Sequence, residues 1–217
     1  SSDLFFLYHM ILQNALGILF AAILTNRTMK GRGVYQTLIF IPCTIAVLVT
    51  GYLFKLMMNP VWAGTTLKKA GLGFLVKPWL GDRSTALSCV SLVSVWQWVG
   101  IPTMMFVAAF QGIPDELIEA ADIEGSNAWQ TFWRITWPLS LPGVLSGITM
   151  VFVPSLTTFV ISDILGGGKI LLIGNVIEQM FTQDNDRNAG AGLSVVMMVF
   201  IVISTMVTEK YDREDVL

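Results

Sequence analysis

Polar side chains inside long apolar stretches are the residues of this chain that most plainly could do chemistry. One stretch holds three of them near its middle, and another holds three toward its end. They are Trp96, Gln97 and Trp98, and Ser155, Thr157 and Thr158. Polar groups are costly inside a bilayer, so they indicate either a path for a polar solute or hydrogen bonds between helices. Amides and hydroxyls serve both purposes, and both interpretations stay open.

The first apolar stretch carries three more polar residues, His9, Gln13 and Asn14. His9 is the single histidine of the chain, and packing or bonding to a neighbour is its simpler role. Lys55 lies near one end of the second stretch, where its long stem would let the ammonium group reach the membrane interface.

Two other features resemble reactive sites but do not fit them. The run Gly166–Lys169 is similar to a phosphate-binding loop, but Ile170 replaces the required Ser or Thr and Asp163 stands where that pattern needs Gly. Cys43 and Cys89 lie in apolar stretches, as small buried hydrophobes do. We therefore expect no nucleotide or metal bound by this chain and no ATP hydrolysis by it.

The segment 111–137 indicates a docking surface rather than a reaction. Pro114 followed by Asp115 and Glu116 is a typical helix start, because the acids lie near the positive end of the helix dipole. Gly125 ends that helix. A second short helix is expected from Asn127 to about Arg134, with aromatic side chains along it. Small residues at such a junction let another protein approach closely, and aromatics supply contact area.

The composition of the chain indicates the kind of fold in which these residues lie. The 217 residues are 54% hydrophobic and 13% charged, about half the usual charge of a soluble domain. All 15 acidic residues and every basic residue except Lys55 lie outside five apolar stretches of about spanning length. The stretches are 4–24, 36–58, 85–110, 138–161 and 191–207. We expect one all-α, polytopic membrane domain over residues 1–217, which excludes a soluble enzyme or a nucleic-acid binder.

Charge alone does not orient these spans. With five spans, the first and third connections and the tail share one side and carry six basic residues, and the other side also carries six. The positive-inside rule therefore gives no answer.

The third connection closely resembles a known motif. Glu119-Ala120-Ala121, then Gly125, Ile135 and Pro138 at their spacing, is similar to the EAA loop of ABC-transporter permease subunits. The family's usual Leu before the last Pro is Trp137 here. In that family the loop is cytoplasmic and forms coupling helices that dock on the ATPase. The alternative is an interfacial hairpin without a partner.

The resemblance implies a type I ABC importer permease fold in the bacterial inner membrane, with loop 111–137 in the cytoplasm. Since the family's loop follows the fourth span of six and here follows the third, the first family span is expected to lie before Ser1. The implied partners are a second permease, two ATP-binding subunits that hold ATP and Mg²⁺, and an extracytoplasmic substrate-binding protein. A membrane-embedded enzyme and a channel are the rival classes.

Different segments of the chain resemble permeases for different substrates. The segments 24–33, 38–42 and 95–100 resemble maltose-type sugar permeases, whereas 139–143, 152–155, 159–163, 165–169 and 173–175 resemble spermidine/putrescine permeases. The second block is longer and less generic, so it favours polyamines, with sugars as the alternative. Polyamine cations would favour carboxylates and aromatic faces along the path. The candidate path residues are Trp96, Gln97, Ser155, Thr158 and Asp163.

Overall fold

The computed structural model describes residues 2–26, 29–61, 79–81, 83–158, 160–167 and 170–214. Within those ranges the regular structure is entirely helical. The α-helices are α1 (Ser2–Tyr8), α2 (Asn14–Thr25), α3 (Arg32–Thr44), α4 (Val47–Met57), α6 (Arg83–Trp98), α7 (Gly100–Gln111), α8 (Asp115–Ile123), α9 (Ala128–Thr131), α10 (Trp137–Thr157), α11 (Val160–Gly166), α12 (Ile173–Thr182) and α13 (Arg187–Glu214). Two π-helices, His9–Gln13 and Phe132–Thr136, join α1 to α2 and α9 to α10.

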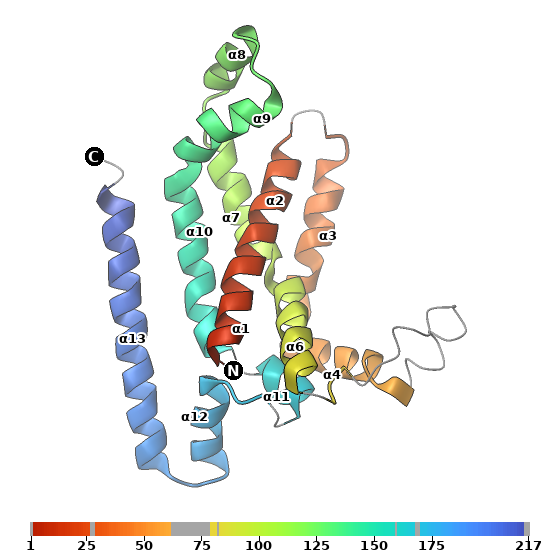
Figure 1. The fold of residues 1–217 in the computed structure, drawn as a ribbon, viewed down its shortest axis with the longest axis vertical. Helices are drawn as coiled ribbons and strands as arrows, with labels where there is room; N and C mark the ends of the chain where they lie inside the picture. Colours follow the sequence, from red (N-terminus) through yellow and green to blue (C-terminus); the bar gives the residue numbers. More distant parts are fainter. Residues whose placement is uncertain are drawn as a thin grey trace.

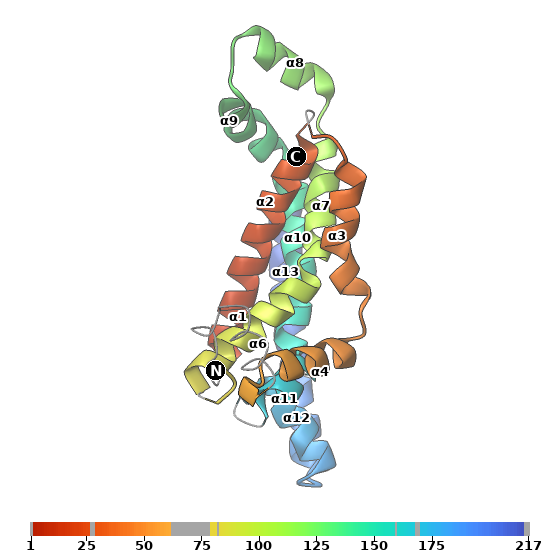
Figure 2. The same cartoon turned by 90° about the vertical axis from the view of Figure 1, so that its right-hand side faces the viewer.

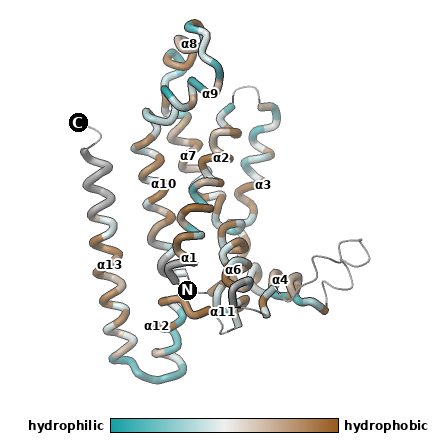
Figure 3. Tube along the Cα trace, in the orientation of Figure 1, coloured by the Kyte–Doolittle hydropathy of each residue, from teal (hydrophilic) through white to brown (hydrophobic). Residues whose placement is uncertain are grey.

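The long helices run up and down between two ends of the molecule (Figures 1 and 2). Helices α8 and α9 and the C-terminal end of α13 lie at one end, and α4, α11 and α12 lie at the other. Figure 3 shows hydrophobic residues along the shafts, with hydrophilic ones at α8–α9 and at the turn between α12 and α13. Among the described residues, three helical stretches are long and apolar enough to cross a membrane, namely Phe5–Thr25, Ala128–Phe152 and Arg187–Met206.

Two further helix pairs reach spanning length only if each bent pair is one span, which gives five. The pair α3 and α4 bends by 94°, and the pair α6 and α7 bends by 47°. The apolar stretch 36–58 therefore lies in a bent helix pair and not in one continuous helix. Ile45 and Ala46 adopt extended backbone angles, with ψ of 133° at both, and that ends α3 and turns α4 across the bundle.

The fourth span and the connection after it also differ from expectation. Helix α10 ends at Thr157, because Thr158 is extended with ψ of 122°. The apolar stretch 138–161 is thus interrupted, and residues 162–190 contain most of α11 and the whole of α12. Asn175 holds this part together, since its Oδ1 accepts from Ser162 Oγ at 2.6 Å and from the Leu172 N–H at 3.1 Å.

Close helix contacts at glycines build the centre of the bundle. Phe106 of α7 is fully buried between α2 and α10. A Cβ on Gly147 would lie 2.5 Å from the Phe106 ring, and one on Gly143 would lie 2.6 Å from Ala109. Gly143 and Gly147 are four residues apart, so they form a small-residue stripe on which α7 packs, the usual way that membrane helices approach closely.

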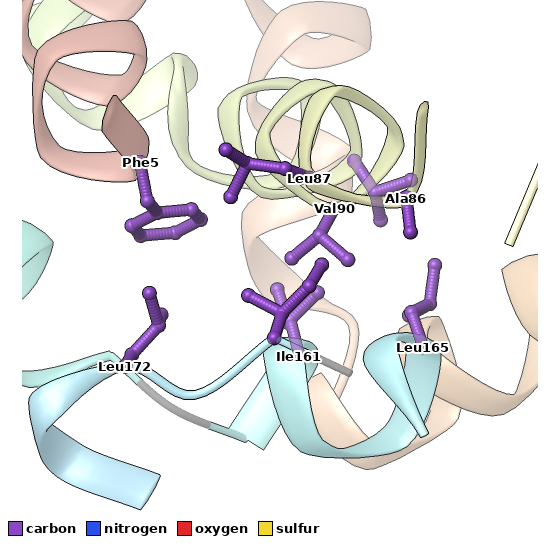
Figure 4. Packing of buried hydrophobic residues seen from close by; sticks show 9 residues of the cluster. Phe5, Ala86, Leu87, Val90, Ile161, Leu165 and Leu172 are labelled. Atoms are coloured by element: carbon purple, nitrogen blue, oxygen red, sulfur yellow. The ribbon is translucent and has the colours of Figure 1, made fainter. Parts of the chain in front are cut away.

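A buried apolar cluster lies at the end of the bundle opposite the helices α8 and α9. Side chains from α1, α6 and α11 point toward one another there, and Leu172 joins them from the segment before α12 (Figure 4). Phe5, Val90 and Ile161 are among its most buried members. This cluster fixes the broken helices α4 and α11 against the shafts.

Candidate functional site

Helix α8 begins and ends as its residues dictate. Pro114 precedes it with an extended ψ of 133°, and Asp115 and Glu116 occupy its first turn. At its end Gly125 has φ of +80°. The Gly125 N–H donates to the Asp122 carbonyl at 3.1 Å and the Ser126 N–H to the Ala121 carbonyl at 3.0 Å, the paired bonds of a Schellman motif. Glycine is the residue best suited to that left-handed position.

Helix α9 begins with a capping box. Asn127 Oδ1 accepts from the Gln130 N–H at 2.9 Å, and Gln130 Oε1 accepts from the Asn127 N–H at 3.1 Å. The second helix was expected over about Asn127–Arg134; in the structure it covers Ala128–Thr131 and passes through the π-helix Phe132–Thr136 directly into α10. The pattern of Asn followed three residues later by Gln was a signal that sequence reasoning missed.

A row of aromatic rings joins this second helix to the bundle. Trp129 and Trp133 meet at 5.7 Å between ring centroids, and Trp133 meets Trp137 at the same separation. Phe132 packs edge-on against Phe110 of α7 at 5.8 Å. The α8–α9 hairpin, residues 115–136, is therefore linked both to α10 through the chain and to α7 through side chains.

The hairpin still presents apolar surface outward. Ile123 is 88% exposed and Trp129 70% exposed. Among the residues expected to couple to an ATPase, Glu119, Ala120, Gly125 and Pro138 are exposed, Ile135 is half-buried and Ala121 is buried. The structure brings all six into or next to one hairpin at one end of the molecule (Figure 2).

The expected path residues do not form one group. Gln97 is fully buried, and its Nε2 donates to the Ile45 carbonyl at 2.9 Å, at the break between α3 and α4. Trp96, by contrast, is 41% exposed and packs edge-on against Phe54. Gln97 therefore positions a bent helix pair, whereas Trp96 points away from the centre.

The other path candidates lie on or after α10. Ser155 is buried and donates to the Phe152 carbonyl at 2.6 Å. It lines a mainly apolar cavity of about 470 Å³ between α1, α10, α12 and α13. Thr158 is half-buried and lines a different, smaller cavity beside His9. Asp163 is exposed on α11. The side chain of Thr157 lies outside the described residues.

Neither cysteine is in a disulfide. Cys43 donates to the Gln97 carbonyl at 3.0 Å and so adds a second link between α3 and α6. Within the described part of the chain, no group of three or more His, Cys, Asp or Glu side chains could hold a metal ion.

The sequence of residues 13–213 matches the family described as binding-protein-dependent transport system inner membrane component. The chain belongs to this family. The match includes the α8–α9 hairpin, which carries the EAA-like motif, and every helix from α2 to α13.

Individual relatives transport different solutes. The arabinooligosaccharides transport system permease protein AraP of Bacillus subtilis (strain 168) is 29% identical over 202 residues, covering 89% of this chain and 64% of AraP. The spermidine/putrescine permease PotB of Escherichia coli (strain K12) is also 29% identical, over 78% of this chain and 73% of PotB. This chain thus spans less than two thirds of the length of the AraP relative.

A solved structure has the same fold. The bacterial alginate ABC transporter in complex with an alginate pentasaccharide-bound periplasmic protein matches with a TM-score of 0.74 at 17% identity, over 97% of this chain and 74% of that chain. The expected permease fold is confirmed by this similarity.

Proposed function

We propose that this chain is the permease subunit of an ATP-driven importer in the cytoplasmic membrane, with ATP hydrolysis on separate subunits. Family membership supports this assignment, and the α8–α9 hairpin is the observation that carries it. The hairpin exposes apolar and acidic residues together at one end of a membrane bundle, which suits a protein partner better than lipid. A second permease, two ATP-binding subunits and an extracytoplasmic binding protein complete the proposed complex.

The proposed coupling follows from how the hairpin is attached. A push on α8 or α9 by the ATP-binding subunits would reach α10 through the π-helix and α7 through the contact of Phe132 with Phe110. Because Phe106 fills the close contact between α7 and α10, these two helices would move together. Glu119 lies on the exposed side of α8 and would pair with a basic group of the partner, so Glu119→Lys should uncouple transport.

For the substrate we propose a neutral carbohydrate. The buried polar side chains in the described spans are amides, hydroxyls and one imidazole, and no Asp or Glu occurs in residues 5–25, 32–58, 85–111 or 137–157. Amides and hydroxyls suit sugar hydroxyls, whereas a polyamine cation needs carboxylates or open aromatic faces. The arabinooligosaccharide relative supports the same class.

Polyamines, which the C-terminal motifs favoured, remain the second candidate. The resemblance to PotB supports them. Asp163 is an exposed carboxylate on α11, at the end of the molecule opposite the hairpin. It could meet a cation on entry, but it does not line the interior.

Uptake into proteoliposomes tests both proposals. The chain would be assembled with a second permease, ATP-binding subunits and a substrate-binding protein. We expect ATP-dependent uptake of a labelled neutral oligosaccharide, such as an arabinotriose or maltotriose, and no competition by spermidine. Uptake of spermidine alone would overturn the carbohydrate proposal. A complex whose ATP hydrolysis never responds to any loaded binding protein would overturn the importer proposal.

A further inference from the structure

The start of α3 and the end of α7 meet beside the root of the α8–α9 hairpin. Arg32 is the first residue of α3, and Gln111 is the last residue of α7, shortly before α8 begins. An arginine side chain has only donors, so the oxygen of the Gln111 amide faces it. In that orientation Nη1 and Nη2 of Arg32 both donate to Gln111 Oε1, Nη1 at 2.9 Å. A hydrogen-bonded contact therefore joins α3 to α7 at the hairpin end of the bundle.

The position of Arg32 is favourable for α7 and unfavourable for its own helix. A cation in the first turn of a helix lies at the positive end of the helix dipole, whereas a cation beside the last turn of a helix is stabilised. Arg32 occupies the first position of α3 and contacts the last residue of α7. Its Nε is buried and has no hydrogen-bond partner in the described part of the chain. Loss of the Gln111 oxygen would therefore leave a half-buried guanidinium with one acceptor fewer.

Helices α3 and α7 also meet at their other ends. A Cβ on Gly100, the first residue of α7, would lie 2.8 Å from the Ile39 carbonyl oxygen and 2.9 Å from Cys43 Sγ on α3. Arg32 and Cys43 are eleven residues apart on α3, as are Gly100 and Gln111 on α7, which is about 16 Å along each helix. The two helices thus run antiparallel, side by side, and are fastened at both ends (Figure 2).

The pair α3 and α4 reaches the end of the molecule opposite the hairpin. Helix α4 follows α3 after the break at Ile45, and it lies beside α11 at that opposite end (Figure 1). Gly51 of α4 is buried, and a Cβ on it would lie 2.9 Å from Ile164 Cδ1 of α11. A movement that α3 shares with α7 would therefore be passed through α4 to α11.

We propose that Arg32 is a positioning residue that makes α3 follow α7 when the ATP-binding subunits move the hairpin. The contact with Gln111 thereby extends the coupling from α7 and α10 to α4 and α11. Without it, the hairpin end of α3 separates from α7, and the movement stays on α7 and α10. This inference rests on the importer function proposed above.

Spin-label distances in the assembled complex test this inference. One label is placed at position 35 of α3 or at position 108 of α7, and the second at position 184 in the turn before α13, all three being exposed. Cys43→Ser, which keeps a hydrogen-bond donor, and Cys89→Ala remove the native thiols. Each distance is measured without nucleotide and with a non-hydrolysable ATP analogue and Mg²⁺.

Four variants separate this contact from a general disturbance. Arg32→Ala and Gln111→Leu each remove one side of the contact, so either one serves if the other fails to assemble. Gln111→Glu is the matched control, because its carboxylate keeps an acceptor in place of the amide oxygen. Lys30→Ala is the second control, since it removes an exposed cation from the same connection.

We expect the ATP analogue to shift both distances in the wild type, in Gln111→Glu and in Lys30→Ala. In Arg32→Ala and Gln111→Leu the shift at position 35 is lost, whereas the shift at position 108 is kept. Equal shifts at position 35 in all these proteins would overturn the role of Arg32, and so would a loss at both positions. If position 108 does not move in the wild type, the proposed coupling through the hairpin fails, and this inference fails with it.

Discussion

Gly125 shows how a single residue can shape the docking surface. Its φ is +80°, and a Cβ there would meet no atom within 4 Å. The requirement at this position is therefore conformational, since space is available. A β-branched residue in the left-handed region costs about 1–2 kcal/mol, whereas Asn adopts it readily.

We accordingly predict that Gly125→Val weakens binding of the ATP-binding subunit about five- to thirtyfold, because the Schellman turn must rearrange. Gly125→Asn is the matched control and should bind almost as the wild type does. Co-purification at graded concentrations of the ATP-binding subunit measures both. Equal binding by the Val and Asn variants would show that the turn does not matter for docking.

A substitution at Gly147 tests the close contact between α10 and α7. Its Cβ would lie 2.5 Å from the Phe106 ring, so Gly147→Val must push α10 away from α7. We predict destabilisation of about 1–3 kcal/mol, seen as a lower melting temperature and less monodisperse protein in detergent. Gly192→Val on α13, where a Cβ meets nothing within 4 Å, should leave both close to wild type. A similar loss in both variants would contradict this account of the bundle.

The role of a residue could be predicted from the sequence only where that role depends on its spacing from neighbouring residues, as in helix capping. The acids after Pro114 and the stop at Gly125 follow from capping rules, and the structure has them where expected. Trp96 and Gln97 were expected to act together, yet one is exposed and the other buried. Adjacent residues on a helix point in directions about 100° apart, and only tertiary packing decides which of them faces inward.

At the scale of elements, the bent helix pair α3 and α4 depends on one side chain. The Ile45 carbonyl at the break receives its hydrogen bond from Gln97, on another helix. Gln97→Leu removes the hydrogen bond to that partly buried carbonyl, so we predict a loss of about 1–3 kcal/mol in the stability of the complex. Ser94→Ala, one turn away, removes a buried hydroxyl that has no partner in the structure and should be neutral or stabilising. Thermal unfolding followed by tryptophan fluorescence compares them, and equal melting temperatures for Gln97→Leu and the wild type would rule out this role.

The sequence predicts five spans, whereas the described residues contain three helices of spanning length, or up to five if each bent pair is one span. The bends were not predicted. Residues 36–58 are apolar on both sides of Ile45, so hydropathy gives no sign of a break. The bond that stabilises it comes from 52 residues away, which no local pattern contains. Pro102 lies just after the bend between α6 and α7, and Pro154 lies just before the end of α10; each removes a backbone donor.

At the scale of the whole molecule, the two ends of the bundle define its orientation. Helices α8 and α9 lie with the C-terminal end of α13, and the turn after α12 lies at the opposite end (Figure 1). We predict that a cysteine at position 123 is protected from a membrane-impermeant maleimide in intact cells, whereas one at position 184 is labelled. Both native residues are exposed. Labelling in the reverse order would invert the topology.

The central claim is that the α8–α9 hairpin is the contact through which ATP hydrolysis drives the spans. The most direct measurement replaces Ile123, 88% exposed on that hairpin, with a photo-crosslinking amino acid in the assembled complex, and uses Asp186 at the other end as the control position. We predict that light links position 123 to the ATP-binding subunit and that position 186 gives no such product. Efficient crosslinks from position 123 to lipid or to the binding protein, with none to the ATP-binding subunit, would contradict the claim.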